Sequence, residues 1–226
     1  MAMRNMLNMM QLCDSMFPAG LFSTSNGIES MYLAKDITSG VDLEEFCAAY
    51  LQNQVGPTDC TTAALAYKYT ATHNIKELEL LDQKITAIKT VQESRRAYRR
   101  SGIQTARCVA NFIQNDTLKW YLQYVSDAGS GSHPVAIGVC CCAMNLEHMM
   151  APLAVSYSFV TSSMGAALRL GMIHHLEAQS IMYSLQPNIL QAAEYGYTSK
   201  DIWQFCPQAE IMQMAHERMD AKMFIT

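Results

Sequence analysis

The stretch from position 149 to position 168, MMAPLAVSYSFVTSSMGAAL, carries no charged residue over 20 positions. A helix that is apolar on every side is stable only if other elements surround it or if it crosses a bilayer, which takes about 20 residues. Serine, threonine and glycine dilute the hydrophobicity of this stretch at six positions, which is unusual for a membrane span. We therefore expect a buried core helix that the rest of the chain covers.

A second segment has the same character. Residues 135–146, like residues 152–170, are rich in alanine, glycine, serine and cysteine and poor in charge. Small side chains allow two helix backbones to approach closely. We expect these two helices to form the central pair of the fold, ringed by amphipathic helices.

The other segments show the spacing of amphipathic helices. Asp42–Glu45 has the pattern of a capping box, and apolar residues then recur at helical spacing until Gly56 and Pro57 end the run. Similar patterns cover residues 58–73, 75–89, 91–115 and 118–126, and three shorter helices follow from Ala178, broken by Pro187, Gly196 and Pro207. Period-2 alternation is almost absent. The sequence thus predicts an all-α protein, a single compact domain over 1–226 with about ten helices around the central pair.

Composition argues against several kinds of partner. The chain of 226 residues has a net charge of -4 and no acidic or basic block, so its overall charge recruits neither nucleic acid nor anionic lipid. Its eight cysteines form no C-x-x-C pair, and Asn8 and Gln11 break the first apolar run, unlike a secretory signal. We expect free thiols in a cytoplasmic protein without a membrane segment.

The sequence carries no recognisable motif for catalysis or cofactor binding. Neither of the usual glycine-rich phosphate loops occurs, so the chain is not expected to bind a nucleotide by itself. On a helix, His174 and His175 point about 100° apart, and Cys140–Cys142 fan around the axis, so neither group can hold one metal ion. We predict no catalytic residue, no metal ligand and no cofactor.

Two other functions are compatible with short parts of the sequence. Arg95–Arg100 contains four arginines in a helical stripe, which a helical RNA-binding protein would use for phosphates, although a solvated or ion-paired face explains the stripe more simply. Ser23 or Ser25 would be the nucleophile of a hydrolase, but no strand precedes them to form the necessary elbow. Both alternatives stay open at this point.

Five segments match the pattern of one known family in the correct order. In the first, LCDSMFPAGLFSTSNGIE (12–29), the matching residues are Pro18, Gly20, Phe22, Ser23, Ser25, Gly27 and Glu29. The others are ESRRAYRRSGIQ (93–104), SHPVAIGV (132–139), ALRLGMIHHLEAQ (167–179) and FCPQAEIMQMAHERMDAKMF (205–224). Leu21 departs from a frequent second glycine, and Met172, His174 and His175 depart from a frequent P-x-G-Q. Over nearly its whole length the chain resembles the urease accessory protein UreF family.

The resemblance implies a helical, non-enzymatic scaffold that forms a homodimer. It implies binding to UreH (also called UreD), to the GTPase UreG and to the apo-urease subunits, and a coupling of GTP hydrolysis to nickel insertion without a permanent metal. The residues that it points to as partner-binding or dimer contacts are Pro18, Gly20, Phe22, Ser23, Glu29, His133, Pro134, Arg169, Gln179, His216, Glu217 and Arg218.

Two of these regions carry structural expectations. The apolar residues of 15–32 should pack onto the central helices, and Asn26–Glu29 should be the capping box of the next helix. Arg169 ends the uncharged stretch. Its guanidinium should therefore bond to carbonyls near the carboxyl end of a helix or pair with an acid such as Glu177.

The last segment carries a third expectation. If residues 205–224 end in a helix, then His216, Asp220 and Phe224 lie on one side of it. Such a helix can bury its apolar residues and still offer a polar face. We expect this face to bind the accessory partners.

Overall fold

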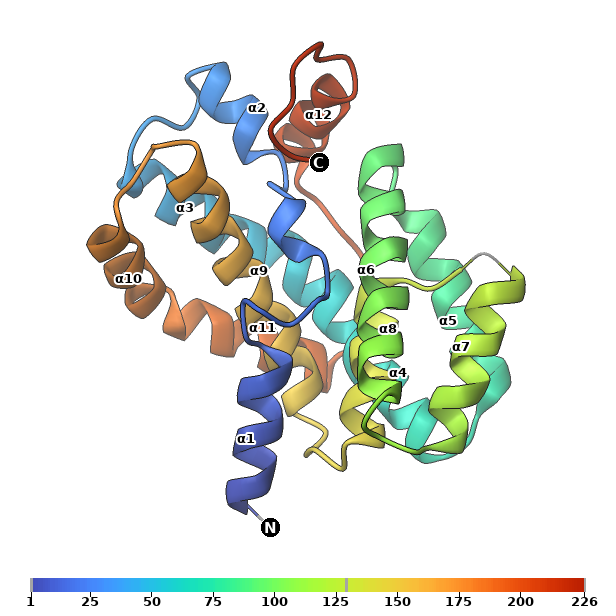
Figure 1. Cartoon of the computed structure of the whole chain (residues 1–226). Coiled ribbons are helices and arrows are strands. Elements are labelled where there is room, and N and C mark those ends of the chain that lie inside the picture. The colour runs from blue at the N-terminus through green and yellow to red at the C-terminus, as the bar shows by residue number, and fades with distance from the viewer. Residues whose placement is uncertain (1, 129, 226) are drawn as a thin grey trace.

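The computed structural model describes residues 2–128 and 130–225, and within these ranges it contains helices and no strand (Figure 1). The α-helices are α1 (Ala2–Leu12), α2 (Ile28–Leu33), α3 (Gly40–Tyr50), α4 (Thr61–Ala71), α5 (Ile75–Ile88), α6 (Gln92–Ala110), α7 (Asp116–Ala128), α8 (His133–Ala143), α9 (Met150–Arg169), α10 (His175–Ser184), α11 (Gln186–Thr198) and α12 (Pro207–His216). A 3₁₀ turn, η1 (Leu21–Ser23), and a π-helical stretch, η2 (Leu51–Cys60), complete the order. The predicted all-α fold is confirmed.

The two uncharged segments become α8 and α9, which lie in different groups of helices. In Figure 1, α8 packs chiefly between α4 and α6, with α5 and α7 beyond them. Helix α9 packs chiefly against α11 and η2, on the side of α3 and α10. Helices α8 and α9 contact each other as expected, but each has a larger interface with other elements: α8 with α4 and α6, and α9 with α11 and η2.

Burial of the uncharged stretch is confirmed. Phe159, Val160, Ser163 and Met164 are all buried in α9, and their neighbours come from both groups of helices. The hydroxyl of Ser163 is hydrogen-bonded although it is buried, because it donates to the carbonyl of Phe159 (2.9 Å). Among the described residues, no helix has both the length and the hydrophobicity to cross a bilayer.

Glycines, which have no side chain, allow the closest helix contacts. A β-carbon on Gly138 in α8 would lie 2.4 Å from the carbonyl oxygen of Ala63 and 2.6 Å from the β-carbon of Ala66. A β-carbon on Gly196 in α11 would lie 2.5 Å from the backbone of Cys60. Both glycines are therefore needed for packing. Gly196 lies within α11, so the prediction that it breaks a helix is wrong.

Pro57 does not end the helix in which it stands. Helices α3 and α4 are joined without a turn by η2, whose wider π-helical spacing accommodates the proline. Pro57 has no N–H to donate to the preceding turn, and the carbonyl of Asn53 instead accepts the N–H of Phe205 (2.9 Å). The hydroxyl of Thr61 donates to the carbonyl of Gly56 (3.1 Å). A distant segment and a neighbouring side chain thus satisfy the carbonyls that the irregular turn exposes.

Several helix ends differ from the prediction. The capping box of α3 uses Ser39 and Asp42, so the helix begins three residues before the expected start at the acidic run. Helix α6 ends at Ala110 instead of near position 115, and α12 ends at His216. Because α12 ends at His216, the residues of the carboxy-terminal motif that follow it are not helical.

Candidate functional site

The amino-terminal segment, defined as residues 15–32, is where the five sequence segments meet. In Figure 1 it passes over α9 toward α12, and both η1 and α2 contact α9. Ser23 joins two other segments to it: the Arg100 guanidinium donates to the Ser23 hydroxyl (2.9 Å), and the N–H of Ile225 donates to the Ser23 carbonyl (2.8 Å). The expectation that this segment packs onto a central helix is confirmed.

A buried cluster of two carboxylates and one imidazole holds the carboxy-terminal segment, defined as residues 217–225. His216 Nε2 lies 2.9 Å from Glu29 Oε2, and His216 Nδ1 lies 2.7 Å from Glu93 Oε2. Carboxylate oxygens only accept when ionised, so each of these contacts needs a proton between its two atoms. Glu29 also accepts the N–H groups of Met223 (2.7 Å) and Phe224 (3.2 Å). One side chain of the amino-terminal segment therefore fixes both the end of α12 and the backbone beyond it.

The second carboxylate of the cluster is stabilised in its charged form. Lys222 Nζ lies 2.5 Å from Glu93 Oε1, on the opposite side from His216. Partial burial favours the neutral acid, but the hydrogen bonds and charges of Lys222 and His216 outweigh it and lower the pKa of Glu93. Glu93 thus connects the start of α6 to the carboxy-terminal segment.

Two sequence expectations are wrong at this cluster. The residue before α2 is Gly27, with φ +91°, which has no side chain to cap the helix, and Glu29 bonds to His216 instead. His216 is fully buried, and α12 ends there, so Asp220 and Phe224 belong to a non-helical segment. The expected exposed face that contains His216 therefore does not form.

Arg169 confirms one of the two expectations for it. Its Nε donates to the carbonyl of Gly165 (2.9 Å), one turn before the end of α9. Its guanidinium also lies 4.3 Å from the centre of the Phe224 ring, and this ring is buried. The carboxyl end of α9 is thereby joined to the carboxy-terminal segment.

A groove of about 340 Å³ opens between the amino-terminal segment, α9 and α10. Its walls are largely apolar and include Leu12, Phe17 and Met182. Arg169 and Gln179 add polar groups, and Gln179 is exposed to solvent. The groove can take an apolar side chain of a partner, with these polar groups available for hydrogen bonds.

The remaining predicted residues lie near these features without joining the buried cluster. Pro18, Glu217 and Arg218 are exposed, and the side chain of Phe22 lies outside the described part of the chain. Glu217 accepts the N–H of Glu93 (3.0 Å), which places it at the start of α6. Pro18 lies between two residues that line the groove.

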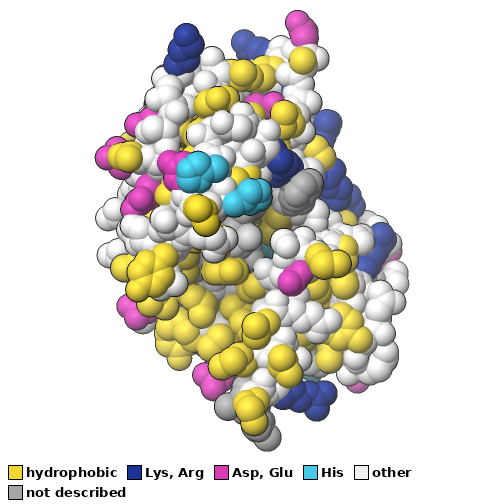
Figure 2. Space-filling view, turned by 60° about the vertical axis from the view of Figure 1, so that its left-hand side comes forward, with side chains coloured by type: hydrophobic (Ala, Val, Ile, Leu, Met, Phe, Trp, Pro, Cys, Tyr) yellow, Lys and Arg dark blue, Asp and Glu magenta, His cyan; other side chains and the backbone are white. Residues whose placement is uncertain are grey.

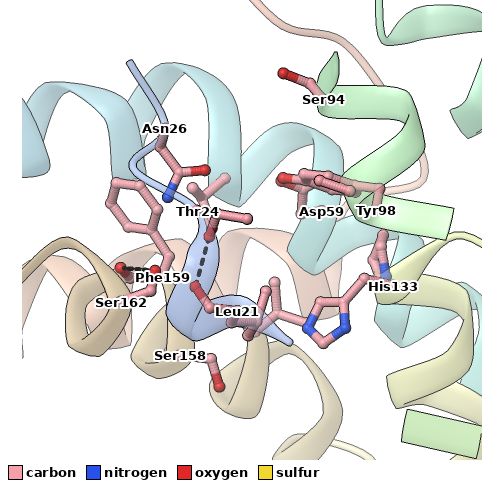
Figure 3. Close-up of a pocket in the computed structure, with 14 residues that line it drawn as sticks. Leu21, Thr24, Asn26, Asp59, Ser94, Tyr98, His133, Ser158, Phe159 and Ser162 are labelled. Carbon is pink, nitrogen blue, oxygen red and sulfur yellow. Dashed lines mark hydrogen bonds between the residues drawn. The ribbon is translucent and has the colours of Figure 1, made fainter. Parts of the chain in front are cut away.

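A smaller cavity of about 40 Å³ lies under η1, where Leu21 and Thr24 face His133, Tyr98 and Ser158 (Figure 3). His133 and Pro134, which begin α8, both line it. His133 Nδ1 lies 3.0 Å from the Ser101 hydroxyl. The cavity brings the third sequence segment against the first.

Acidification is expected to destabilise the fold through His133. Burial lowers the pKa of His133 from 6.5 to about 4. The unfolded chain takes up a proton between these pH values and the folded chain does not, so stability is complete above pH 6.5 and falls as the pH drops toward 4, by about 3 kcal/mol. Urea unfolding at neutral pH and at about pH 4.5 should show a smaller loss for His133→Gln than for the parent. His175→Gln, which changes an exposed histidine, is the control, and equal losses in all three proteins would contradict the expectation.

The cysteines and histidines form no obvious ligand set. Among residues 2–128 and 130–225, no group of three His, Cys, Asp or Glu side chains is placed to hold a metal ion. Burial raises the pKa of Cys140 and Cys141, so these thiols stay protonated near neutral pH. The structure therefore places them as small apolar side chains in the core of α8.

The sequence prediction missed three residues that the site uses. Glu93, Arg100 and Lys222 all make side-chain contacts to the amino- or carboxy-terminal segment. Glu93 and Arg100 lie within residues 93–104, where the sequence signal was already present. Lys222 lies within residues 205–224, another matching segment, but its pairing with Glu93 is a long-range contact that is visible only after the chain folds.

Comparisons with known proteins show similarity over nearly the whole chain. A protein-family model described as UreF matches residues 37–186. The urease accessory protein UreF of Trichodesmium erythraeum (strain IMS101) is 30% identical over 224 residues, which cover 96% of this chain and 95% of the relative. The urease accessory protein UreF 1 of Brucella melitensis biotype 1 is 26% identical over 225 residues, covering 97% and 92%, and the UreF of Actinobacillus pleuropneumoniae is 24% identical over 221 residues, covering 96% and 97%. The similarity thus extends across the buried cluster at both of its ends.

Proposed function

Because the chain belongs to the UreF family of urease accessory proteins, we propose that it is a non-enzymatic scaffold for nickel insertion into apo-urease. In this proposal it binds UreH (UreD), the GTPase UreG and the apo-urease subunits, and it couples GTP hydrolysis by UreG to nickel delivery. The observation that carries the proposal is that the other four matching segments all contact the amino-terminal one, at the groove, the buried cluster or the cavity under η1. A role in urease maturation follows from the family alone.

The geometry supports binding more than chemistry. The Ser23 hydroxyl donates to the carbonyl of Gly20 (3.0 Å) and accepts from Arg100, so it faces an arginine where a hydrolase needs a base. Ser25 is fully buried. Polar groups of the site are largely committed to holding chain segments together, which is the property of a rigid binding surface.

A homodimer is part of the proposal. Large apolar side chains are exposed on α1 and α10, with exposed fractions of 82% for Met3, 66% for Leu7 and 79% for Leu176. Figure 2 shows hydrophobic side chains gathered over the lower part of the face that it displays. Exposed apolar surface of this kind is typical of an interface between copies or with partners.

The groove should be the contact for UreH (UreD). We expect Gln179→Arg to leave the helical content and melting temperature unchanged, because the side chain is exposed, and to reduce co-purification with UreH (UreD) about tenfold. Gln191→Arg, at an exposed position of α11, is the matched control. The mass of the parent chain in sedimentation, one or two times 25.2 kDa, tests the dimer in the same preparation.

Urease assays separate the contact from the function. In a host from which its own UreF gene has been deleted, the parent chain and Gln191→Arg should restore nickel-dependent urease activity. Gln179→Arg should restore less activity. If Gln179→Arg assembles the complex like the parent, the groove is not the contact. If the parent chain itself restores no activity in a host with otherwise matching accessory proteins, the proposed function is wrong.

A further inference from the structure

A pocket of about 140 Å³ with arginines among its lining residues lies on α6, outside the groove and the buried cluster. Its walls come from α6, the end of α5 and the residues just before α8. Arg95, Arg96 and Arg99 all line it, and no acidic residue is among its described lining residues. Arg96 and Arg99 are exposed to solvent.

Backbone carbonyls hold the guanidinium group of Arg95 in place. Arg95 Nη1 donates to the carbonyls of Lys89 (2.8 Å) and Thr90 (2.7 Å), just beyond the carboxyl end of α5. A fixed guanidinium loses little conformational entropy when it binds an anion. The wall of the pocket is therefore pre-organised before any ligand arrives.

Two acidic side chains that contact lining residues of the pocket are engaged in buried interactions. Asp59 forms a buried ion pair with Lys89 (3.0 Å) and accepts from the Tyr98 hydroxyl (2.8 Å). Asp82 is buried and accepts the N–H of Ser132 (2.8 Å), at the edge of the pocket. Because Asp59 neutralises Lys89, the positive charge of the pocket comes from the arginines.

The charge of the pocket is opposite to that of the chain as a whole. The net charge is -4, yet α6 contains five arginines and one glutamate. Arg95 and Arg99 are four positions apart, and like charges at this spacing repel and destabilise a helix by about 0.2–0.5 kcal/mol. An anion between the guanidinium groups would relieve that repulsion.

We propose that this pocket binds a phosphate group. Planar guanidinium groups form paired, charge-assisted hydrogen bonds with tetrahedral oxyanions, and three of them around a small concave site favour a compact dianion over a single carboxylate. The phosphate is either free in solution or the terminal group of a nucleotide, since both present the same oxygens. This inference concerns a different surface from the one that the proposed scaffold function uses.

Titration calorimetry with inorganic phosphate tests the site. The parent chain should bind one equivalent, and Arg96→Gln with Arg99→Gln should weaken the affinity at least about tenfold, which corresponds to about 1.4 kcal/mol. Arg4→Gln with Arg107→Gln removes the same charge at exposed positions outside the pocket and should bind like the parent. Titration with GDP then separates the sources: GDP binding more tightly than phosphate identifies a nucleotide, and equal affinity identifies free phosphate.

Three results would overturn the proposal. The first is a parent chain that gives no heat with phosphate at millimolar concentration. The second is equal weakening in both double variants, which would mean that net charge and not the pocket attracts the anion. The third is binding of a single-stranded RNA oligonucleotide without binding of phosphate, with an affinity that falls steeply with salt. That result would assign the arginines to an extended nucleic-acid surface.

Discussion

Gly138→Ala is expected to lower the free energy of unfolding by about 3 kcal/mol, because the new methyl group has no space. The β-carbon would lie 2.4 Å from the carbonyl oxygen of Ala63 and 2.8 Å from the backbone nitrogen of Tyr67. Both are backbone atoms of α4, which cannot turn away as a flexible side chain could. Helices α4 and α8 would have to separate along one of the largest interfaces of the fold. In a chain of this length the melting temperature should fall by roughly 10 °C.

Gly165→Ala is the matched control and should have the opposite sign. Gly165 also lies within a helix, but its β-carbon would meet only Arg169 Nη2, at 3.9 Å, outside its own helix backbone, which is an ordinary contact. Replacing a helical glycine with alanine at a site with space raises stability by about 0.5–1 kcal/mol. Thermal unfolding followed by circular dichroism measures both variants. Similar melting temperatures for the two would show that α4 and α8 are not held at the distance described.

Glu29→Ala should cost about as much, for an electrostatic reason. Glu29 is 3% exposed, and its removal leaves His216 facing only one carboxylate and two backbone N–H groups without an acceptor. Each buried polar group left without its hydrogen-bond partner costs about 1–3 kcal/mol. The carboxy-terminal segment should also detach, so limited proteolysis should cut within residues 217–225 at a protease concentration that leaves the parent intact.

Asp220→Ala removes an acid from the same segment and is the control. Asp220 is exposed, so its loss should change the melting temperature and the cleavage rate very little. Glu29→Ala behaving like Asp220→Ala would mean that the cluster of Glu29, His216 and Glu93 does not hold the segment.

The fold was predictable from the sequence where local signals dominate. The uncharged stretch of α9 and the amphipathic period of α3 and α5 depend on spacing within a single helix, and they are right. The end expected at Pro57 was wrong because the N–H of Phe205, nearly 150 positions away, satisfies the carbonyl of Asn53. A local rule cannot contain that contact.

The residues of the candidate site were likewise predictable only where the signal is local. The sequence points to both Glu29 and His216, but it predicts only a local role for each, in a helix capping box and on an exposed helix face. The structure joins them to each other, and this pairing is a long-range contact that periodicity and capping rules do not describe. Glu93 was passed over for the same reason, although it lies in a recognised segment.

The contact between Glu29 and His216 also fixes an order of events during synthesis. His216 follows Glu29 by 187 positions. At about 5–20 residues per second, a ribosome needs roughly 10–40 s to cover that distance. During this interval Glu29 is already made and its buried partner is not. The amino-terminal segment therefore completes its tertiary contacts only after translation has passed residue 216, however fast the helices between them fold.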